Sequence, residues 1–229
     1  MRTSRRWSSR DLALVASFAA LIAVLGLPGA LYVFGNTVPI TLQTLGVMLA
    51  GAILGWRRGA AAVLVFLVLV AVGLPLLSGG RGGLGVFAGP SVGYLIAWPL
   101  GAAVTGALVQ ARWPRYPLWW GVLANVIGGM VVVYALGIPG VAVMTGTPLA
   151  AAAASAVIYL PGDLAKALIA AIVTAGVRRG YPRIAEEPRL LRRDPKPLQG
   201  RPLQGRALEG GPDTAGQQDS QRAGDTGTR

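Results

Sequence analysis

The sequence predicts an all-α integral membrane protein with six transmembrane helices. Of its 229 residues, 53% are hydrophobic and only 13% are charged, whereas about 25% are charged in an ordinary soluble domain. The mean hydropathy is +0.56. A soluble core of this size cannot bury so much apolar surface, and the apolar runs have the length of bilayer-crossing helices. Between residues 12 and 177 the only acids and bases, tyrosines aside, are Arg57, Arg58, Arg81, Arg112, Arg115, Asp163 and Lys166.

Six apolar runs follow one another along the chain, and a helix needs roughly 20 such residues to cross the hydrocarbon core. The first resembles a signal peptide, because a basic stretch precedes it. More runs follow, so we interpret it as a retained first helix. The second and third are separated only by the tight basic turn GWRRGA. The predicted spans are residues 12–33, 39–55, 59–76, 90–110, 117–136 and 149–178.

The basic residues between the runs predict the orientation. The N-terminus, the second and fourth loops and the end of the sixth run each carry at least two Arg, whereas the first and fifth loops carry none and the third carries one. Lys and Arg concentrate on the cytoplasmic side of membrane proteins. We therefore expect both termini to be cytoplasmic and the protein to cross the membrane several times.

Three regions result from this division. Residues 1–11 form a basic cytoplasmic N-terminus, and residues 12–179 form the membrane domain. Residues 180–229, with the repeat PLQGRPLQGRALEGG, have few large apolar side chains and are predicted to be a disordered cytoplasmic tail. Basic residues at the start of the tail are candidates for contact with anionic membrane lipids.

Composition excludes several classes of function. The net charge of +12 forms no compact basic domain, so we expect no nucleic-acid partner. The chain has no Cys and no His, which removes the commonest metal ligands and general base. A membrane aspartyl protease needs two carboxylates, and this region has one. A Ser–Lys dyad would need Ser155 and Lys166, eleven residues apart across a Pro-Gly break. We therefore expect neither an enzyme nor a metal site.

The stretch YLPGDLAKAL, residues 159–168, places opposite charges within an apolar run. Pro161 and Gly162 predict a kink or a new helix start, so that Asp163 lies in the first turn, where the helix dipole favours a carboxylate. Asp163 and Lys166 are three residues apart and share a helix face. Charges inside a membrane usually face the bundle interior or a cavity, which predicts a binding site. The alternative is a salt bridge that only neutralises both charges.

Other polar residues are candidates to complete a pocket. The third loop, LPLLSGGRGGLGVFAGPSVGYL, combines a high density of glycine with Arg81, which is suited to capturing an anionic group. Gln43, with its neighbours Thr41 and Thr44, and Asn125 lie within spans. Each of these more often makes a helix–helix hydrogen bond. The aromatic and glycine candidates are Tyr94, Phe87 and Gly83.

In the first span, the pairs Ala16 and Ala20, and Ala19 and Ala23, are four residues apart. Small residues at this spacing allow another helix to pack closely. The sequence does not distinguish internal packing from a partner subunit.

Three segments in order, VPITLQTLGVMLAGAILG, GLPLLSGGRGGLGVFAGPSVGYL and LPGDLAKALIAA, together resemble the BioY family, the biotin-binding S-components of energy-coupling factor (ECF) transporters. The resemblance covers about residues 12–179. It implies an ECF S-component-like bundle of six helices, with a pocket near the outer face that is capped by the first and third loops. It also implies biotin uptake across the cell membrane, with no cofactor in this chain.

The resemblance also suggests how biotin is recognised. Asp163 accepts hydrogen bonds from the ureido N–H groups, and Asn125 or Gln43 donates to the ureido oxygen. Lys166 or Arg81 pairs with the carboxylate. Tyr94, Phe87 and the glycine backbone of residues 79–85, which includes Gly83, enclose the rings.

The expected partners are a transmembrane coupling subunit, which the alanines of the first helix contact, and two ATPases, which alone use ATP because this chain has no Walker A motif. Two alternatives remain open. An ion-coupled carrier of another vitamin-like anion would use Asp163 as a lone ion site. A structural scaffold would bind no small molecule.

Overall fold

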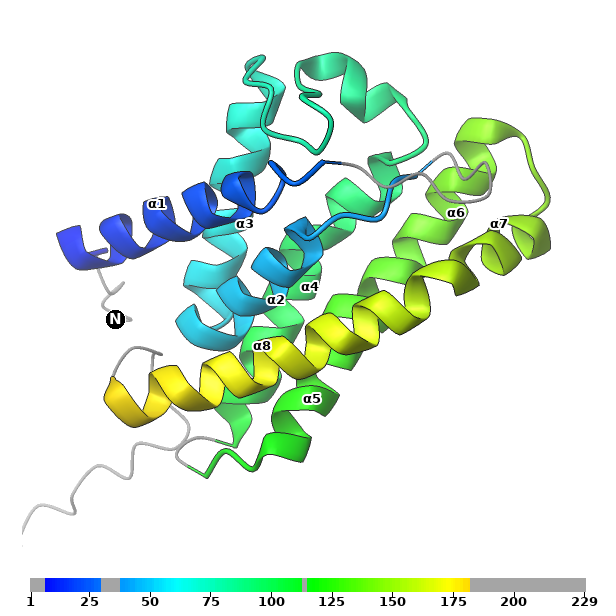
Figure 1. Ribbon diagram of the computed structural model, residues 1–229. Helices are drawn as coiled ribbons and strands as arrows, with labels where there is room; N and C mark the ends of the chain where they lie inside the picture. The colour runs from blue at the N-terminus through cyan, green and yellow to red at the C-terminus, as the bar shows by residue number, and fades with distance from the viewer. Residues whose placement is uncertain (1–6, 30–37, 113–114, 182–229) are drawn as a thin grey trace, which may run out of the picture. The chain divides into compact units, whose positions relative to one another are not determined.

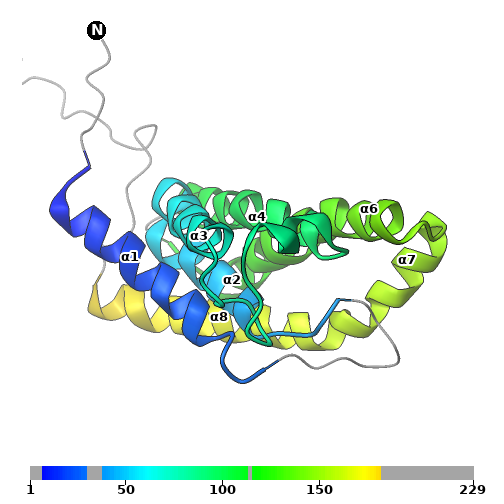
Figure 2. The same ribbon diagram turned by 90° about the horizontal axis from the view of Figure 1, so that it is seen from above.

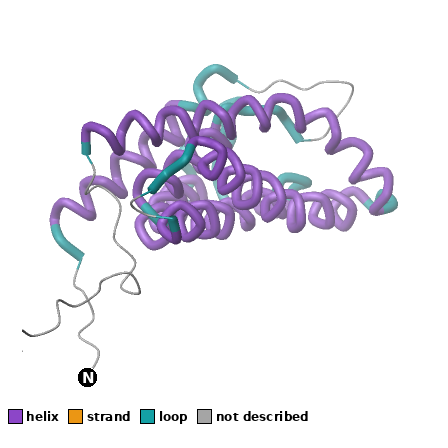
Figure 3. The backbone as a smooth tube through the Cα atoms, turned by 90° about the horizontal axis from the view of Figure 1, so that it is seen from below, coloured by secondary structure: helices purple, strands orange, loops and turns teal. Residues whose placement is uncertain are grey.

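Helices form almost all of the structure, a computed structural model that describes residues 7–29, 38–112 and 115–181. Figure 3 shows helices joined by loops throughout these residues. An isolated bridge between Leu77 and Arg81 is the only strand-like pairing in the described part of the chain. All described residues belong to one unit, Met1–Arg192. Residues 182–229 lie outside the described residues, so the disordered tail stays a prediction.

Six helical rods correspond to the six predicted spans (Figure 1). The fifth is the continuous run Leu118–Thr145, and the sixth is Leu149–Gly180. Three rods, these two and Val92–Ala111, are long and apolar enough to cross a membrane by length and composition. In order, the elements are α1 (Ser9–Val24), α2 (Gln43–Leu54), α3 (Trp56–Ala71), η1 (Leu84–Ala88), α4 (Val92–Ala111), α5 (Leu118–Val126), η2 (Ile127–Val132), α6 (Val133–Thr145), α7 (Leu149–Ala156), η3 (Val157–Tyr159) and α8 (Leu160–Gly180).

The predicted boundaries differ most from the observed helices at two places. The first span ends at Val24, nine residues before the predicted limit of 33. The fifth span was predicted to end at 136, but α6 continues to Thr145 through Pro139. Neighbouring helices in a membrane bundle satisfy the backbone groups that an internal proline frees, so proline does not end such a helix. Gly146, with φ of +69°, ends it instead in the left-handed conformation.

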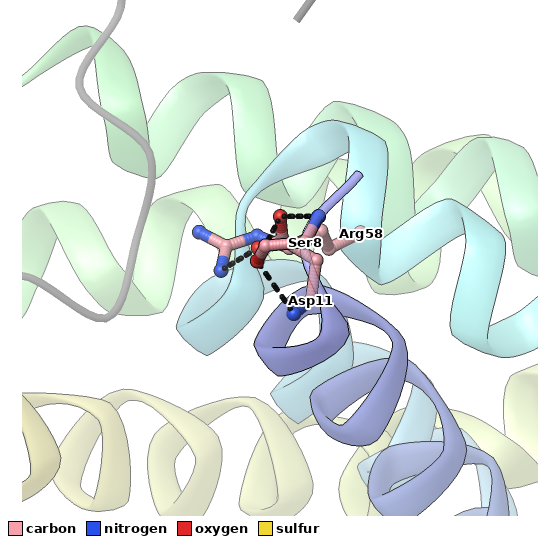
Figure 4. A network of polar contacts seen from close by, with 3 residues as sticks. All are labelled: Ser8, Asp11 and Arg58. Carbon is pink, nitrogen blue, oxygen red and sulfur yellow. Dashed lines mark hydrogen bonds and ion pairs between the residues drawn. The ribbon is translucent and has the colours of Figure 1, made fainter. Parts of the chain in front are cut away.

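The start of α1 is tied to the start of α3 (Figure 4). The Ser8 hydroxyl accepts a hydrogen bond from the Asp11 N–H at 3.2 Å, and the Asp11 carboxylate accepts from the Ser8 N–H at 3.0 Å, which forms a capping box. The same carboxylate pairs with the buried guanidinium of Arg58 at 3.1 Å. The ion pair therefore joins two helices that are 47 residues apart in sequence.

Helix α2 lies at the centre of the bundle and packs against α1, α3, α4 and α8. Nearly all of its residues are buried, which is why it is apolar on every side rather than amphipathic. It crosses α4 with the two backbones in close contact: a Cβ on Gly51 would lie 2.4 Å from the carbonyl oxygen of Ala102. The centre of the bundle is therefore fixed by small residues.

Two irregular turns interrupt the two longest rods. A π-helical turn, η2, joins α5 to α6, and a 3-10 turn, η3, joins α7 to α8. The sequence predicted a break at Pro161, and the break lies just before it, so that Pro161 occupies the first turn of α8. Figure 2 shows α6 along one side of the molecule and α7 and α8 running back along the other, with α6 and α7 meeting at one end. Asp163 consequently lies in the first turn of α8, as predicted.

Candidate ligand-binding site

A cavity that opens to the surface lies among α2, α4, α6 and α8. Its walls include residues 38–41 before α2, Gln43 and Thr44 at the start of α2, and the loop residues Leu77 and Arg81. Ser91, Tyr94 and Trp98 line it from the start of α4. The cavity is therefore lined by segments that lie far apart in the sequence, from Val38 to Lys166.

Asp163 and Lys166 line this cavity from the first turns of α8. The Lys166 ammonium lies 2.9 Å from Asp163 Oδ1, and only about 8% of either side chain is exposed. Lys166 Nζ also donates to Thr44 Oγ1 at 3.0 Å. An ammonium has three N–H donors and a carboxylate about four acceptor positions. Each group therefore keeps hydrogen-bonding capacity that these contacts do not use.

Tyr134, in the first turn of α6, is a cavity residue that the sequence analysis missed. Its hydroxyl donates to Asp163 Oδ2 at 2.6 Å, so the two carboxylate oxygens have different partners. A short bond of this kind, to a charged acceptor, orients the carboxylate. The sequence held one signal: Tyr134 is a polar aromatic residue inside a predicted span.

Three tyrosine rings form one wall of the cavity. Tyr94 lies edge-to-face with Tyr134, at 6.3 Å between ring centroids, and with Tyr159, at 6.4 Å. The Tyr94 ring also packs closely on Gly137, where a Cβ would lie 2.3 Å from a ring carbon. This arrangement gives a rigid aromatic surface beside the charged pair.

The Tyr159 hydroxyl also fixes the mouth of the cavity. It donates to the carbonyl oxygen of Val38 at 2.7 Å, and both residues line the cavity. The bond attaches the described end of the first loop to the junction of α7 and α8.

Gln43 lines the cavity, yet its amide is occupied by the backbone. Its Nε2 donates to the carbonyl oxygens of Ile22 and Leu76 at 3.3 and 3.0 Å, and its Oε1 accepts from the Ser78 N–H at 3.1 Å. Gln43 thus joins the end of α1, the start of α2 and the third loop. Both of its N–H groups are used, so the predicted donation to a ligand would require one of these bonds to break.

Arg81 lies at the edge of the cavity and of a shallow groove along residues 80–91. Its Nε donates to the Ser78 carbonyl oxygen at 3.3 Å, and the side chain is half-buried. The glycines on either side adopt the tight turns that only glycine allows: Gly80 and Gly83 have φ of +71° and +82°. The loop therefore holds Arg81 where its guanidinium can reach the cavity mouth.

Three predicted site residues do not line the cavity. Phe87 packs against the hydrophobic core from η1, and the Gly83 N–H donates to the Val70 carbonyl oxygen at 2.8 Å. Asn125 is completely buried in α5, with its Nδ2 donating to Gly121 O at 2.8 Å. It precedes Tyr134 by nine residues, about 13 Å along a helix. The sequence placed Asn125 in the correct span but did not reveal its depth.

The alanine pairs of α1 face different ways. Ala16 and Ala20 are exposed, whereas Ala19 is buried and Ala23 packs against the core. Internal packing accounts for Ala19 and Ala23, and the exposed pair is available to a partner.

The chain is similar to known proteins along its membrane part. The BioY family model matches residues 1–183. A biotin transporter BioY of Rhizobium etli is 48% identical over 180 residues, covering 76% of this chain and 96% of the relative. A biotin transporter BioY of Rhodobacter capsulatus is 44% identical over 183 residues, covering 76% and 95%. The crystal structure of the S-component for biotin from an ECF-type ABC transporter matches with a TM-score of 0.73 and 29% identity, covering 76% of this chain and 95% of that one.

Proposed function

The chain belongs to the BioY family, and from this premise we propose that it binds biotin and serves its uptake as the substrate-specific S-component of an ECF-type transporter. The family is one of transporter components, not enzymes. In this chain, the main support for the proposal is the cavity lined by Asp163 and Lys166, because both charged groups keep hydrogen-bonding capacity there.

The chemistry of biotin suits this cavity. Its ureido ring offers N–H donors, which Asp163 accepts, and its carboxylate suits Lys166 or Arg81. Its fused rings are apolar enough to pack on the tyrosine wall formed by Tyr94, Tyr134 and Tyr159. An unpaired charge in an apolar bundle is costly. Pairing Asp163 with Lys166 therefore lowers the free-energy cost of placing the two charges in the cavity.

The several apolar helices make the chain a multi-pass membrane protein. We place it in the cytoplasmic membrane with both termini inside, because the positive-inside distribution of Arg favours that orientation. The cavity mouth then faces outward, since Arg81 and the third loop lie at its edge. Tagging Thr147, between α6 and α7, with a membrane-impermeant label after Thr147→Cys tests this orientation: labelling of intact cells is expected.

ATP-driven uptake would require partners, because this chain has no Walker A motif. We propose a transmembrane coupling subunit and two ATPases. The exposed pair of Ala16 and Ala20 on α1 is the surface that suits close packing with a membrane helix of the coupling subunit. Ala16→Leu is expected to weaken assembly and to leave biotin binding unchanged, as measured by co-purification and calorimetry.

The experiment that tests the proposed function is calorimetry of the purified chain with biotin, in detergent, with desthiobiotin and lipoate as competitors. Tight, saturable binding to biotin is expected. A well-folded chain that binds no biotin would overturn the proposal. Binding to biotin combined with uptake that survives ATP depletion and collapses under a protonophore would retain the ligand and replace the ATPases by ion coupling.

A further inference from the structure

Helix α4 contributes two polar aromatic side chains to the cavity, Tyr94 and Trp98. The two residues are four positions apart, so they lie on one face of the helix, about one turn from each other. Both side chains are deeply buried, since only 8% of Tyr94 and 6% of Trp98 is exposed. Hydrogen-bonding groups on this face of α4 therefore have little contact with water.

The three hydroxyls of the tyrosine wall differ in their hydrogen bonds. Tyr134 donates to Asp163 Oδ2 at 2.6 Å, and Tyr159 donates to the carbonyl oxygen of Val38 at 2.7 Å. Within the residues that the structure describes, the Tyr94 hydroxyl has no hydrogen-bond partner. Trp98 Nε1 is likewise buried without a partner there. A buried donor without an acceptor costs free energy, so these two donors on α4 call for an acceptor that the described fold does not supply.

The complementary group, a hydrogen-bond acceptor with negative charge, lies on the neighbouring wall of the cavity. Asp163 on α8 lines the cavity and is bonded to Tyr134, whose ring lies edge-to-face with that of Tyr94 at 6.3 Å between centroids. The cavity thus offers donors from α4 close to a carboxylate from α8. A ligand group that suits both walls carries an acceptor oxygen and N–H donors close together.

A ureido group has this pattern, because its carbonyl oxygen and its two N–H nitrogens are bonded to the same carbon. The sequence analysis suggested Gln43 or Asn125 as the donor to the ureido oxygen. Both N–H groups of Gln43 donate to backbone carbonyl oxygens, and Asn125 does not line the cavity. Lys166 and Arg81 are cations, which suit the carboxylate of biotin better than its neutral oxygen. The neutral donors of α4 therefore fit the ureido oxygen.

We propose that the Tyr94 hydroxyl donates a hydrogen bond to the ureido oxygen of biotin, which makes Tyr94 a specificity-determining residue for cyclic ureas. Trp98 Nε1 is a second donor on the same face of α4. This inference rests on the proposed function, because it takes biotin as the ligand. A site built to hydrogen-bond a polar group of its ligand discriminates against an analogue that lacks the group. Binding should therefore depend on the strength of the acceptor at the ureido position.

The test is calorimetry of the full chain in detergent with biotin and with 2-thiobiotin. In 2-thiobiotin a sulfur, which is a weak acceptor, replaces the ureido oxygen, while the N–H groups and the carboxylate remain. Tyr94→Phe is expected to weaken biotin binding about fivefold, as for the loss of one hydrogen bond. It should weaken 2-thiobiotin binding much less, so that the preference of the wild type for biotin becomes smaller.

The matched control is Tyr159→Phe, the same chemical change on the same wall. The Tyr159 hydroxyl donates to the Val38 carbonyl oxygen rather than to the ligand. Its loss should therefore affect both ligands alike and keep the ratio of their affinities.

The thermal midpoint of the ligand-free chain separates a ligand contact from a structural one. Tyr94→Phe keeps the ring contacts with Tyr134 and Tyr159 and removes a hydroxyl that has no acceptor among the described residues. The midpoint should therefore stay the same or rise. Tyr159→Phe removes an existing hydrogen bond and should lower the midpoint.

Unchanged biotin affinity in Tyr94→Phe, beside a wild type that binds biotin, would overturn this inference and leave the proposed function intact. Equal losses for biotin and 2-thiobiotin would overturn the assignment to the ureido oxygen, as would an equal change of the affinity ratio in Tyr159→Phe. A lower midpoint in ligand-free Tyr94→Phe would assign the hydroxyl to the fold instead. If the folded wild type binds no biotin, the proposed function fails and this inference fails with it.

Discussion

Two aspartate–cation pairs in this molecule are similar in distance and different in setting. Asp163 and Lys166 lie 2.9 Å apart on a single helix, and Asp11 and Arg58 lie 3.1 Å apart on two helices. The second pair joins α1 to α3 and supports the fold (Figure 4). The first lies within one helix and lines a cavity, and its two members also bond Thr44 of α2 and Tyr134 of α6. The comparison indicates that the Asp163–Lys166 pair is placed for a ligand, whereas the Asp11–Arg58 pair stabilises the packing of two helices.

The largest effect on biotin affinity is expected from Asp163→Asn. It removes the negative charge that a ligand N–H group and Lys166 both need, so biotin affinity is expected to fall by about 2–5 kcal/mol, the usual loss when one member of a buried charge pair is removed. Calorimetry measures this loss. Asp11→Asn is the matched control, with the same chemical change at the other pair. Equal losses of affinity in the two variants would contradict the distinction.

Lys166→Ala is expected to cost about 2 kcal/mol of binding free energy, because it removes the proposed ligand contact and the ion-pair partner of Asp163. The loss should be smaller for biotin methyl ester than for biotin if the ammonium binds the carboxylate. Calorimetry with both ligands provides the measurement. An identical loss for both ligands would show that Lys166 acts only through Asp163.

Asp11→Asn is expected to lower stability and to spare the cavity. It removes the carboxylate charge that pairs with the buried guanidinium of Arg58, which costs about 1–3 kcal/mol of unfolding free energy. The midpoint of thermal unfolding measures the effect. Ser8→Ala is the control, since it removes the helix cap and the hydroxyl's hydrogen bond to Asp11 but keeps the Asp11–Arg58 ion pair, and it should cost about 1 kcal/mol. A loss of biotin affinity in Asp11→Asn, with the fold intact, would contradict the architectural role.

The smallest expected effect belongs to Tyr134→Phe. The ring and its contact with Tyr94 remain, and only the 2.6 Å hydrogen bond to Asp163 is lost. Biotin affinity should fall by about 1 kcal/mol. Calorimetry detects this fivefold change. No change at all would show that the carboxylate keeps its orientation through Lys166 alone.

The sequence predicted the fold and the charged pair because both depend on composition along the chain. Six apolar runs predict six helices, and a carboxylate in such a run stands out against its surroundings. Asp163 and Lys166 were therefore found as cavity residues, and Arg81, Tyr94 and Gln43 lie with them. Whether they bind a ligand stays a prediction.

The sequence did not reveal how far along its helix a residue lies, which way its side chain points, or which residues it bonds. Asn125 and Tyr134 belong to the same helical run, Leu118–Thr145, but only Tyr134 lines the cavity. The run was predicted to end at 136, so Tyr134 was placed at a terminus rather than beside Asp163. Gln43 was located correctly, but its backbone partners come from segments that fold against it from 21 to 35 residues away. Such pairings appear only in three dimensions.

The hydrogen bond between Lys166 and Thr44 spans 122 residues of sequence, and that between Tyr159 and Val38 spans 121. Contacts this distant raise the contact order and form late in folding. A ribosome adds roughly 5–20 residues per second, so roughly 6–24 s pass between the synthesis of Thr44 and that of Lys166. Throughout that interval the nascent chain has the central helix and no cavity, so a polypeptide truncated before α8 would insert helices without acquiring a site.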